Sequence, residues 1–208
     1  MRLGIYGGSF DPVHYGHLLL AENCREECRL DEVWFVPAQV SPHKLDREMT
    51  PSRQRVEMLE LALAGNERLK VSTLEIDRCG VSYTVDTLRS IQAEQPQDEL
   101  FLLMGADSLR DLLTWREPAE ICRLACPIVI RRNGAPEPDL AILVDLVPEH
   151  RLAAIRAQQV KMPLIELSSS DLRQRATASQ SLRFRTPRAV EEYIRAHGLY
   201  REVAVNVP

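Results

Sequence analysis

The sequence predicts an α/β fold with a mostly parallel sheet of five or six strands and helices on both faces. Short apolar runs alternate along the 208 residues with longer stretches in which apolar residues recur at helical spacing. Clusters of glycine or serine follow several of these runs, as at the strand-to-helix turns of parallel sheets. The length and the 45% content of hydrophobic residues predict one globular domain over residues 1–208, with a helical part from about residue 168.

The first two strands are expected at residues 3–6 and 33–36, which are short and apolar. Between them, apolar and charged residues alternate at helical spacing up to Cys28, which predicts a helix that begins at Tyr15 or Gly16. Gly7 and Gly8 permit a positive φ where the first strand turns toward this helix.

Residues 37–51 contain three prolines and no periodicity, which indicates a loop. A helix is expected over 52–64, with Ser52 as its N-cap. Its apolar stripe comprises Val56, Leu59, Leu61, Ala62 and Leu63, with Arg53, Arg55, Glu57 and Glu60 elsewhere. Residues 69–76 are rich in apolar and β-branched side chains and predict the third strand.

A polar entry into another helix is expected at residues 82–88, with a hydroxyl side chain available as its cap. Residues 99–104 predict a central strand that ends at Gly105, and Asp107 is placed to cap the helix that follows. The fifth strand is expected at 127–130, with Arg132 at its carboxyl end.

The last third of the chain has weaker signals. A short strand is expected around 142–146, a helix from Glu149 and a last strand at 162–167. Ser168 to Arg175 then predicts a serine-capped helix. A final helix is expected from Thr186, with Pro187 near its start and His197-Gly198 at its end.

Charge and composition limit the classes of partner. The net charge of −4 gives no general reason to bind a polynucleotide. No apolar run approaches the roughly 20 residues of a membrane span, and no signal peptide is visible, so a cytoplasmic protein is expected. Five cysteines favour reduced thiols, and the pairs Cys24/Cys28 and Cys122/Cys126 are interpreted as small core residues.

Two stretches predict phosphate binding. In the first, His14 and His17 stand three apart behind Gly7-Gly8, at a helix start whose N–H groups and positive dipole end favour a triphosphate. In the second, Ser168 and Ser169 offer hydroxyls, and Arg173 offers a guanidinium for phosphate oxygens. A structural histidine pair and a plain serine cap with surface arginines are the simpler alternatives.

Other candidates are less specific. His43 and Lys44 supply two cationic donors, or belong to a solvated loop. Asp107 can accept hydrogen bonds from ribose or support a magnesium shell, but aspartate near a helix start is common. Trp115 can stack on a pyridine ring or belong to the core.

The stretch from Gly7 to Leu18, GGSFDPVHYGHL, resembles the signature of the HxGH nucleotidyltransferase superfamily and is most similar to the bacterial nicotinate mononucleotide adenylyltransferase family. Two further segments, SYTVDTL at 82–88 and SSSDLR at 168–173, resemble segments of the same family. Ser170 stands where that family more often has threonine. The resemblance therefore extends over essentially the whole chain.

This resemblance implies a Rossmann-like fold and transfer of AMP from ATP to nicotinate mononucleotide, which yields nicotinate adenine dinucleotide and pyrophosphate in NAD biosynthesis. Magnesium is expected to be bound by the substrate, with no metal site in the protein. The implied catalytic residues are His14, His17 and Arg173. The implied ATP-binding residues are Gly7, Gly8, Ser9, Phe10, His14, His17, Gly105, Asp107, Ser168, Ser169 and Arg173. The implied mononucleotide-binding residues are His43, Lys44, Tyr83, Thr84, Trp115 and Arg132.

Other functions stay open at this point. A related adenylyltransferase could use nicotinamide mononucleotide or phosphopantetheine as acceptor, and a nucleotide-binding regulator would show no turnover. Hydride transfer is disfavoured because neither a Walker P-loop nor a dinucleotide-binding glycine pattern occurs. The sequence leaves open a homo-oligomer and the purpose of an arginine cluster that comprises Arg173, Arg175, Arg183, Arg185 and Arg188.

Overall fold

The computed structural model describes residues 1–42, 49–132, 137–163 and 165–201. Within them, six parallel strands form one sheet in the order β3-β2-β1-β4-β5-β6. The strands are β1 (Arg2–Gly8), β2 (Glu32–Pro37), β3 (Leu69–Val71), β4 (Glu99–Gly105), β5 (Ala125–Arg132) and β6 (Gln159–Met162). The predicted α/β class with a parallel sheet is confirmed.

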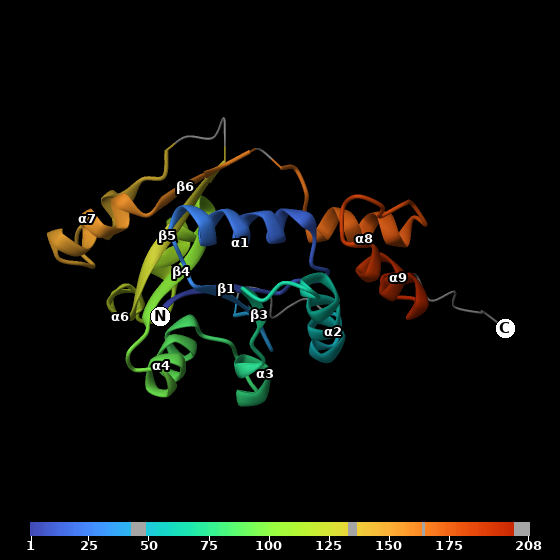
Figure 1. Cartoon of the computed structure of the whole chain (residues 1–208), viewed down its shortest axis with the longest axis horizontal. Helices are drawn as coiled ribbons and strands as arrows, with labels where there is room; N and C mark the ends of the chain where they lie inside the picture. The colour runs from blue at the N-terminus through green and yellow to red at the C-terminus, as the bar shows by residue number, and fades with distance from the viewer. Residues whose placement is uncertain (43–48, 133–136, 164, 202–208) are drawn as a thin grey trace.

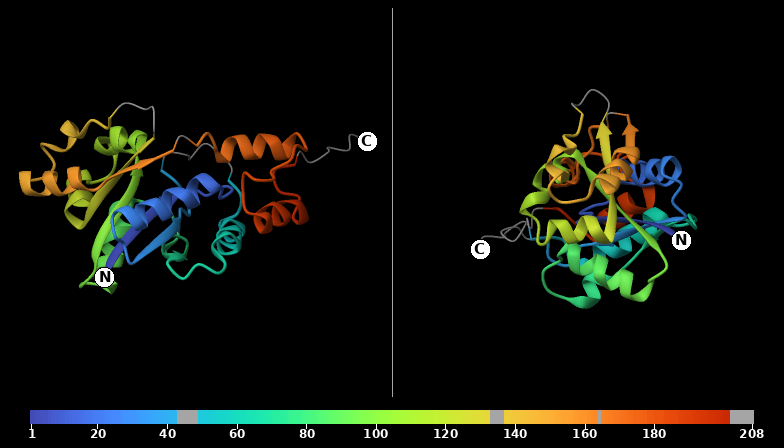
Figure 2. Two further views of the ribbon diagram at one scale, coloured as in Figure 1. Left: turned by 45° about the horizontal axis from the view of Figure 1, so that its top comes forward. Right: turned by 90° about the vertical axis from the view of Figure 1, so that its left-hand side faces the viewer.

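Helices cover both faces of the sheet, with α1 on one side and α3 and α4 on the other (Figure 1). Further views place α7 and α8 at opposite ends of the molecule (Figure 2). The helices are α1 (Tyr15–Glu27), α2 (Ser52–Leu63), α3 (Leu74–Arg78), α4 (Thr84–Glu94), α5 (Ala106–Asp111), α6 (Pro118–Leu124), α7 (Glu149–Ala157), α8 (Ser169–Thr177) and α9 (Arg188–Ala196), with short 3-10 helices η1 (Leu112–Thr114) and η2 (Leu140–Leu143).

The strand order reverses at β1, which pairs with β2 on one side and with β4 on the other. The register runs from Leu3 opposite Glu32 to Gly8 opposite Pro37, so β1 and β2 end together. Ligands of open parallel sheets bind at the carboxyl ends of strands, beside such a reversal. The turn between β1 and α1 is therefore at the edge where a ligand is expected.

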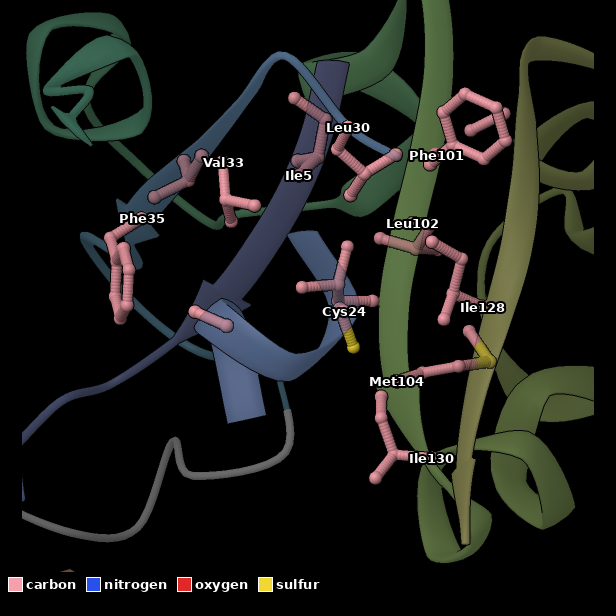
Figure 3. Close-up of a cluster of buried hydrophobic side chains, with 14 of the residues drawn as sticks. Ile5, Cys24, Leu30, Val33, Phe35, Phe101, Leu102, Met104, Ile128 and Ile130 are labelled. Carbon is pink, nitrogen blue, oxygen red and sulfur yellow. The ribbon is translucent and has the colours of Figure 1, made fainter. Parts of the chain in front are cut away.

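The core lies between the sheet and its helices. Figure 3 shows Cys24 of α1 among side chains of the central strands, including Ile5, Leu102 and Met104. Cys24, Cys28, Cys122 and Cys126 are buried and unbridged, which confirms the prediction of reduced core thiols. Burial raises the pKa of Cys28 and of Cys122 to about 11, so these thiols stay protonated at neutral pH.

Three predicted strands differ from the observed elements. The third covers only Leu69–Val71, because the chain turns at Ser72 and Thr73 into α3, where Thr73 Oγ1 donates to Asp77. The last strand is Gln159–Met162 and not 162–167, because Pro163 has no N–H for continued pairing. Residues 142–146 form no strand, since the Asp139 carboxylate accepts from the Ala141 N–H and starts η2.

Several expected helix ends also change. Ser52 is the first residue of α2, and its N-cap is Pro51. Asp107 is the second residue of α5, and the N-cap is Gly105. Leu61 of the predicted apolar stripe is 39% exposed. The starts of α1 and α7 and the cap of α8 are confirmed. Of the described helices, none is both long and apolar enough to cross a bilayer.

Candidate active site

The turn between β1 and α1, residues Ser9 to His14, is named the signature turn here. Its positive φ belongs to Phe10, at 47°, and not to Gly7 or Gly8 as expected. Gly8 is required for another reason, because a Cβ there would lie 2.9 Å from the Phe10 ring. Phe10 is 1% exposed as a whole residue, so its place is in the packing beneath the turn.

Arg55 of α2 holds the signature turn from behind. Its side chain is 1% exposed and donates to three backbone carbonyls, those of Thr50 (2.9 Å), Ser9 (2.9 Å) and Ala38 (2.7 Å). Burial lowers the pKa of Arg55, and the nearby Asp11 carboxylate acts in the opposite direction. This guanidinium therefore ties the signature turn to the loop after β2 and to the segment before α2.

The sequence contained one sign of this role. Arg55 stands three and four residues before Met58 and Leu59, which are both buried, and thus on the inner side of α2. An arginine is almost never fully buried without partners. Its placement outside the predicted apolar stripe was wrong, because its partners are backbone carbonyls from distant segments that a sequence pattern does not reveal.

Side chains from the C-terminal part of the chain donate hydrogen bonds to three consecutive carbonyls near the end of the signature turn. Arg173 Nη1 donates to the Asp11 carbonyl at 2.5 Å, and Ser169 Oγ donates to that of Pro12 at 2.8 Å. Thr186 Oγ1 donates to that of Val13 at 2.8 Å. The C-terminal helices and the segment between them are therefore tied directly to the signature turn.

The Asp11 side chain is buried at 3% exposure and makes two further links. Its carboxylate accepts from the Tyr200 hydroxyl at 2.6 Å and from the Thr50 N–H at 3.3 Å. Burial and the neighbouring carboxylate raise the pKa of Tyr200. The phenol thus stays a donor, and the segment after α9 is tied to the signature turn. The sequence contained no indication of a role for Tyr200 or Thr186.

His14, which ends the signature turn, and His17 of α1 stack on each other, with ring centroids 3.7 Å apart and planes inclined by 20°. The His14 backbone N–H donates to His17 Nδ1 at 3.2 Å. An accepting Nδ1 leaves the ring proton on Nε2. The Phe10 ring meets that of His17 edge-on at 5.1 Å. His17 is thereby oriented with Nε2–H as its donor.

His14 is 5% exposed, and burial lowers its pKa to about 4. It is therefore uncharged at neutral pH. Its Nδ1 is buried and has no hydrogen-bond partner among the described residues. A Cβ on Gly16 would lie 3.0 Å from that nitrogen and from Cε1. The glycine between the histidines thus leaves room for the His14 ring.

A chamber of about 420 Å³ adjoins the signature turn. It is lined by the ends of β1 and β4, the start of α4 and residues 114–116. Of the residues expected to bind nucleotides, it brings together Gly7, Gly8, Ser9, Tyr83, Thr84, Gly105, Asp107 and Trp115. Trp115 is half-buried and packs against the core, and its stacking on a pyridine ring stays a prediction.

The first turn of α4 presents backbone donors at this chamber. Its first intrahelical bonds are those that the Asp86 and Thr87 N–H groups donate to the Tyr83 carbonyl, at 3.1 and 3.2 Å. The N–H groups of Thr84 and Val85 precede them and have no acceptor within the helix. Thr84 lines the chamber, whereas Val85 is fully buried behind it. Tyr83 is the N-cap and contributes no side-chain cap. These donors and the helix dipole favour an anionic group.

A buried carboxylate that the sequence did not single out braces this turn. Thr87 Oγ1 donates to Glu75 Oε1 at 2.6 Å, and Arg78 Nη2 donates to Thr87 Oγ1 at 3.1 Å. Glu75 is 6% exposed and lines the chamber. This chain of bonds joins α3 to α4.

Asp107 lines the chamber, but its side chain is 75% exposed and paired with Arg110. The other predicted site residues lie apart from the chamber or beyond the described structure. Ser168 caps α8 by accepting from the Asp171 N–H at 3.1 Å. His43 and Lys44 lie outside the described residues, as does the side chain of Arg132. In the described chain, no group of three His, Cys, Asp or Glu residues could hold a metal ion.

The chain is similar in sequence to proteins of known family. The family of cytidylyltransferase-like proteins matches residues 5–175. A protein of Thermomicrobium roseum described as a "probable nicotinate-nucleotide adenylyltransferase" is 45% identical over 207 residues, which cover 100% of this chain and 95% of the relative. One of Thermus thermophilus with the same description is 44% identical, over 97% of this chain and 100% of the relative. The chain belongs to the nicotinate-nucleotide adenylyltransferase family.

The fold of this family member also resembles solved structures. The Plasmodium falciparum nicotinic acid mononucleotide adenylyltransferase complexed with NaAD superposes with a TM-score of 0.73 at 19% identity, over 96% of this chain and 97% of the other. A second structure of that protein, complexed with APC, gives a TM-score of 0.71 at 18% identity. At such identities the likeness extends to the fold alone, and it agrees with the Rossmann-like fold predicted for this nicotinate-nucleotide adenylyltransferase family member.

Proposed function

We propose that this chain transfers AMP from ATP to nicotinate mononucleotide, with nicotinate adenine dinucleotide and pyrophosphate as products. Membership of the family supports the reaction. The observation that carries the proposal is that the signature turn lies next to both the histidine pair and the chamber. The same turn that orients the stacked His14 and His17 also borders a chamber with a tryptophan and a helix start. A nucleotide phosphate and a pyridine ring can thus be bound side by side.

The chemistry is a single displacement at phosphorus. A 5′-phosphate oxygen of the mononucleotide attacks the α-phosphorus of ATP, and the bond from that phosphorus to the oxygen that bridges to the β-phosphate breaks. Pyrophosphate leaves with the bonding electrons. Because a phosphate is already a nucleophile, the protein need only orient the reactants and stabilise the charge that develops.

His17 is assigned to the α-phosphate and the departing pyrophosphate, through Nε2–H. His14 is uncharged and buried, and it acts as a neutral hydrogen-bonding partner for the phosphates. Arg173 is assigned to the phosphates as well, from a guanidinium that also binds the Asp11 carbonyl. Ser169 gives its one hydroxyl proton to Pro12, so its part is to hold the turn.

The chamber is assigned to the pyridine ring of nicotinate mononucleotide. Trp115 and Tyr83 offer aromatic faces, and the N–H groups at the start of α4, where Thr84 lines the chamber, offer donors to a ring carboxylate. A carboxamide has one oxygen acceptor and one NH₂ donor. Its NH₂ group would face a backbone N–H group, which would then lack an acceptor. The acid is therefore the preferred substrate over the amide.

ATP is expected to enter as its magnesium complex, with the ion bound by phosphate oxygens and water. Asp107 at the chamber rim is the carboxylate that would accept hydrogen bonds from this water or from ribose.

The test is pyrophosphate release from ATP with a panel of acceptors. Nicotinate mononucleotide is expected to give the highest kcat/KM, nicotinamide mononucleotide a value lower by roughly 5- to 150-fold, and phosphopantetheine no reaction. Turnover with phosphopantetheine and with neither mononucleotide would contradict the proposed acceptor. Nucleotide binding without pyrophosphate release from any acceptor would indicate a regulator.

A further inference from the structure

Arg116 follows Trp115 and lines the chamber. Among the described residues around that chamber, it is the one lysine or arginine. Two carboxylates, Glu75 and Asp107, line the same space. An acceptor that carries a ring carboxylate thus meets like charge on the chamber wall, and Arg116 supplies the charge that offsets it.

Two contacts hold the Arg116 guanidinium over the first turn of α4. Its Cζ lies 4.9 Å from the centre of the Tyr83 ring, within the range of a cation–π contact. Its Nη1 donates to Asp86 Oδ2 at 3.2 Å. Tyr83 is the N-cap of α4 and Asp86 is its third residue, so the guanidinium borders the turn whose N–H groups belong to Thr84 and Val85.

Arg116 can turn toward a ligand without leaving its carboxylate partners alone. Asp86 lies 3.8 Å from Arg89, and Glu117 accepts from Arg89 at 2.6 Å. Arg116 lies 3.7 Å from Glu117. Asp86 and Glu117 therefore keep a cationic neighbour when Arg116 is redirected, and the Arg116 side chain is 51% exposed.

We propose that Arg116 is a specificity-determining residue, whose guanidinium favours an acceptor with a ring carboxylate over one with a carboxamide. This inference rests on the proposed function. A guanidinium gives a carboxylate two charge-assisted hydrogen bonds, whereas a neutral carboxamide gains no ionic contribution. The backbone N–H groups at the start of α4 and the Arg116 guanidinium thus both bind the ring carboxylate.

The experiment measures kcat/KM for nicotinate and nicotinamide mononucleotides with the wild type, Arg116→Gln, Arg116→Lys and Arg123→Gln. The acid-to-amide ratio is expected to fall about tenfold in Arg116→Gln, chiefly through KM of the acid, and Arg116→Lys to recover part of it. Arg123→Gln is the matched control, since Arg123 is an exposed arginine of α6 that pairs with Glu120 and does not line the chamber. Its ratio is expected to equal that of the wild type.

A second readout separates charge from structure. Because Arg116 is half exposed, the wild-type preference for the acid should weaken as salt is raised, and Arg116→Gln should lack most of this dependence. An unchanged ratio in Arg116→Gln, or an equal loss for both substrates, overturns the inference. If the wild type turns over neither mononucleotide, the proposed function itself fails, which is a different result.

Discussion

The buried guanidinium of Arg55 donates a 2.9 Å hydrogen bond to the carbonyl oxygen of Ser9, 46 residues away in the sequence. Two more carbonyls, from Thr50 and Ala38, accept from the same group. One side chain thus joins three segments behind the signature turn. Its influence on the chemistry is exerted through the position of that turn.

Arg55→Met should destabilise the protein and slow turnover. The variant leaves three buried carbonyls without donors, which should cost roughly 3–5 kcal/mol of the free energy of unfolding. Misplacing the turn should lower kcat by about tenfold or more. Urea unfolding and steady-state kinetics measure the two effects, and Arg55→Lys should fall between the variant and the wild type.

Arg53→Met is the control, because Arg53 is on the same helix but its side chain is 90% exposed. Its free energy of unfolding should change by less than about 0.5 kcal/mol. If Arg55→Met unfolds at the same urea concentration as Arg53→Met, the scaffold role of Arg55 is wrong.

His17→Ala should keep the fold and lose the chemical step. Removing a donor aimed at developing charge typically lowers kcat by on the order of 10²-fold or more. Stability should fall by only about 1 kcal/mol, because His17 Nδ1 accepts the His14 N–H at the start of α1. Kinetics beside thermal unfolding test this, with exposed His150→Ala as the control. Turnover within a few-fold of wild type would refute the phosphate role.

Gly16→Ala should separate stability from activity. The new Cβ would lie 3.0 Å from the His14 ring and displace it. Alanine in place of glycine within a helix adds about 1 kcal/mol of stability, which offsets part of the strain. We therefore expect a melting temperature near that of the wild type and kcat lower by roughly tenfold or more. Full activity in a stable Gly16→Ala variant would mean that the position of His14 does not matter.

The stability of the protein should depend on His14 below pH 6.5. Burial lowers its pKa to about 4, so between these values the unfolded chain binds a proton that the folded protein does not. The free energy of unfolding must then fall as the pH is lowered from 6.5 toward 4. Between about pH 7 and about pH 5 this one group contributes a loss of about 2 kcal/mol.

Urea unfolding of the wild type and of His14→Asn at both pH values isolates this contribution. The variant should lose about 2 kcal/mol less than the wild type over this range, since asparagine does not titrate there. Equal losses would show that His14 is accessible to protons in the folded state.

The strands next to the sheet centre could be predicted from the sequence because they are long and buried. Residues 3–6, 33–36, 99–104 and 127–130 each lie inside an observed strand. The edge strands β3 and β6 were misplaced because their ends depend on where pairing stops, at Ser72 and Pro163. Such ends are set by neighbours in space and not by hydrophobicity.

The site was predicted in part. The histidine pair and the segment at Tyr83-Thr84 lie where their position between strand and helix indicated. The contacts of Ser169 and Arg173 with the signature turn were not foreseen, nor was that of Arg55. These are bonds from side chains to distant backbone carbonyls, and they leave no periodic pattern in the sequence. The roles of His14, His17 and Arg173 toward ATP stay predictions.

The central claim, direct adenylyl transfer to nicotinate mononucleotide, is tested most directly by following both products in a phosphorus NMR time course. With ATP, magnesium and nicotinate mononucleotide, nicotinate adenine dinucleotide and pyrophosphate should appear at equal rates and in equal amounts. Without the acceptor neither should form, because in a single displacement the nucleophile is the phosphate of the acceptor. Pyrophosphate formed without the acceptor, or without the dinucleotide in its presence, would contradict this account.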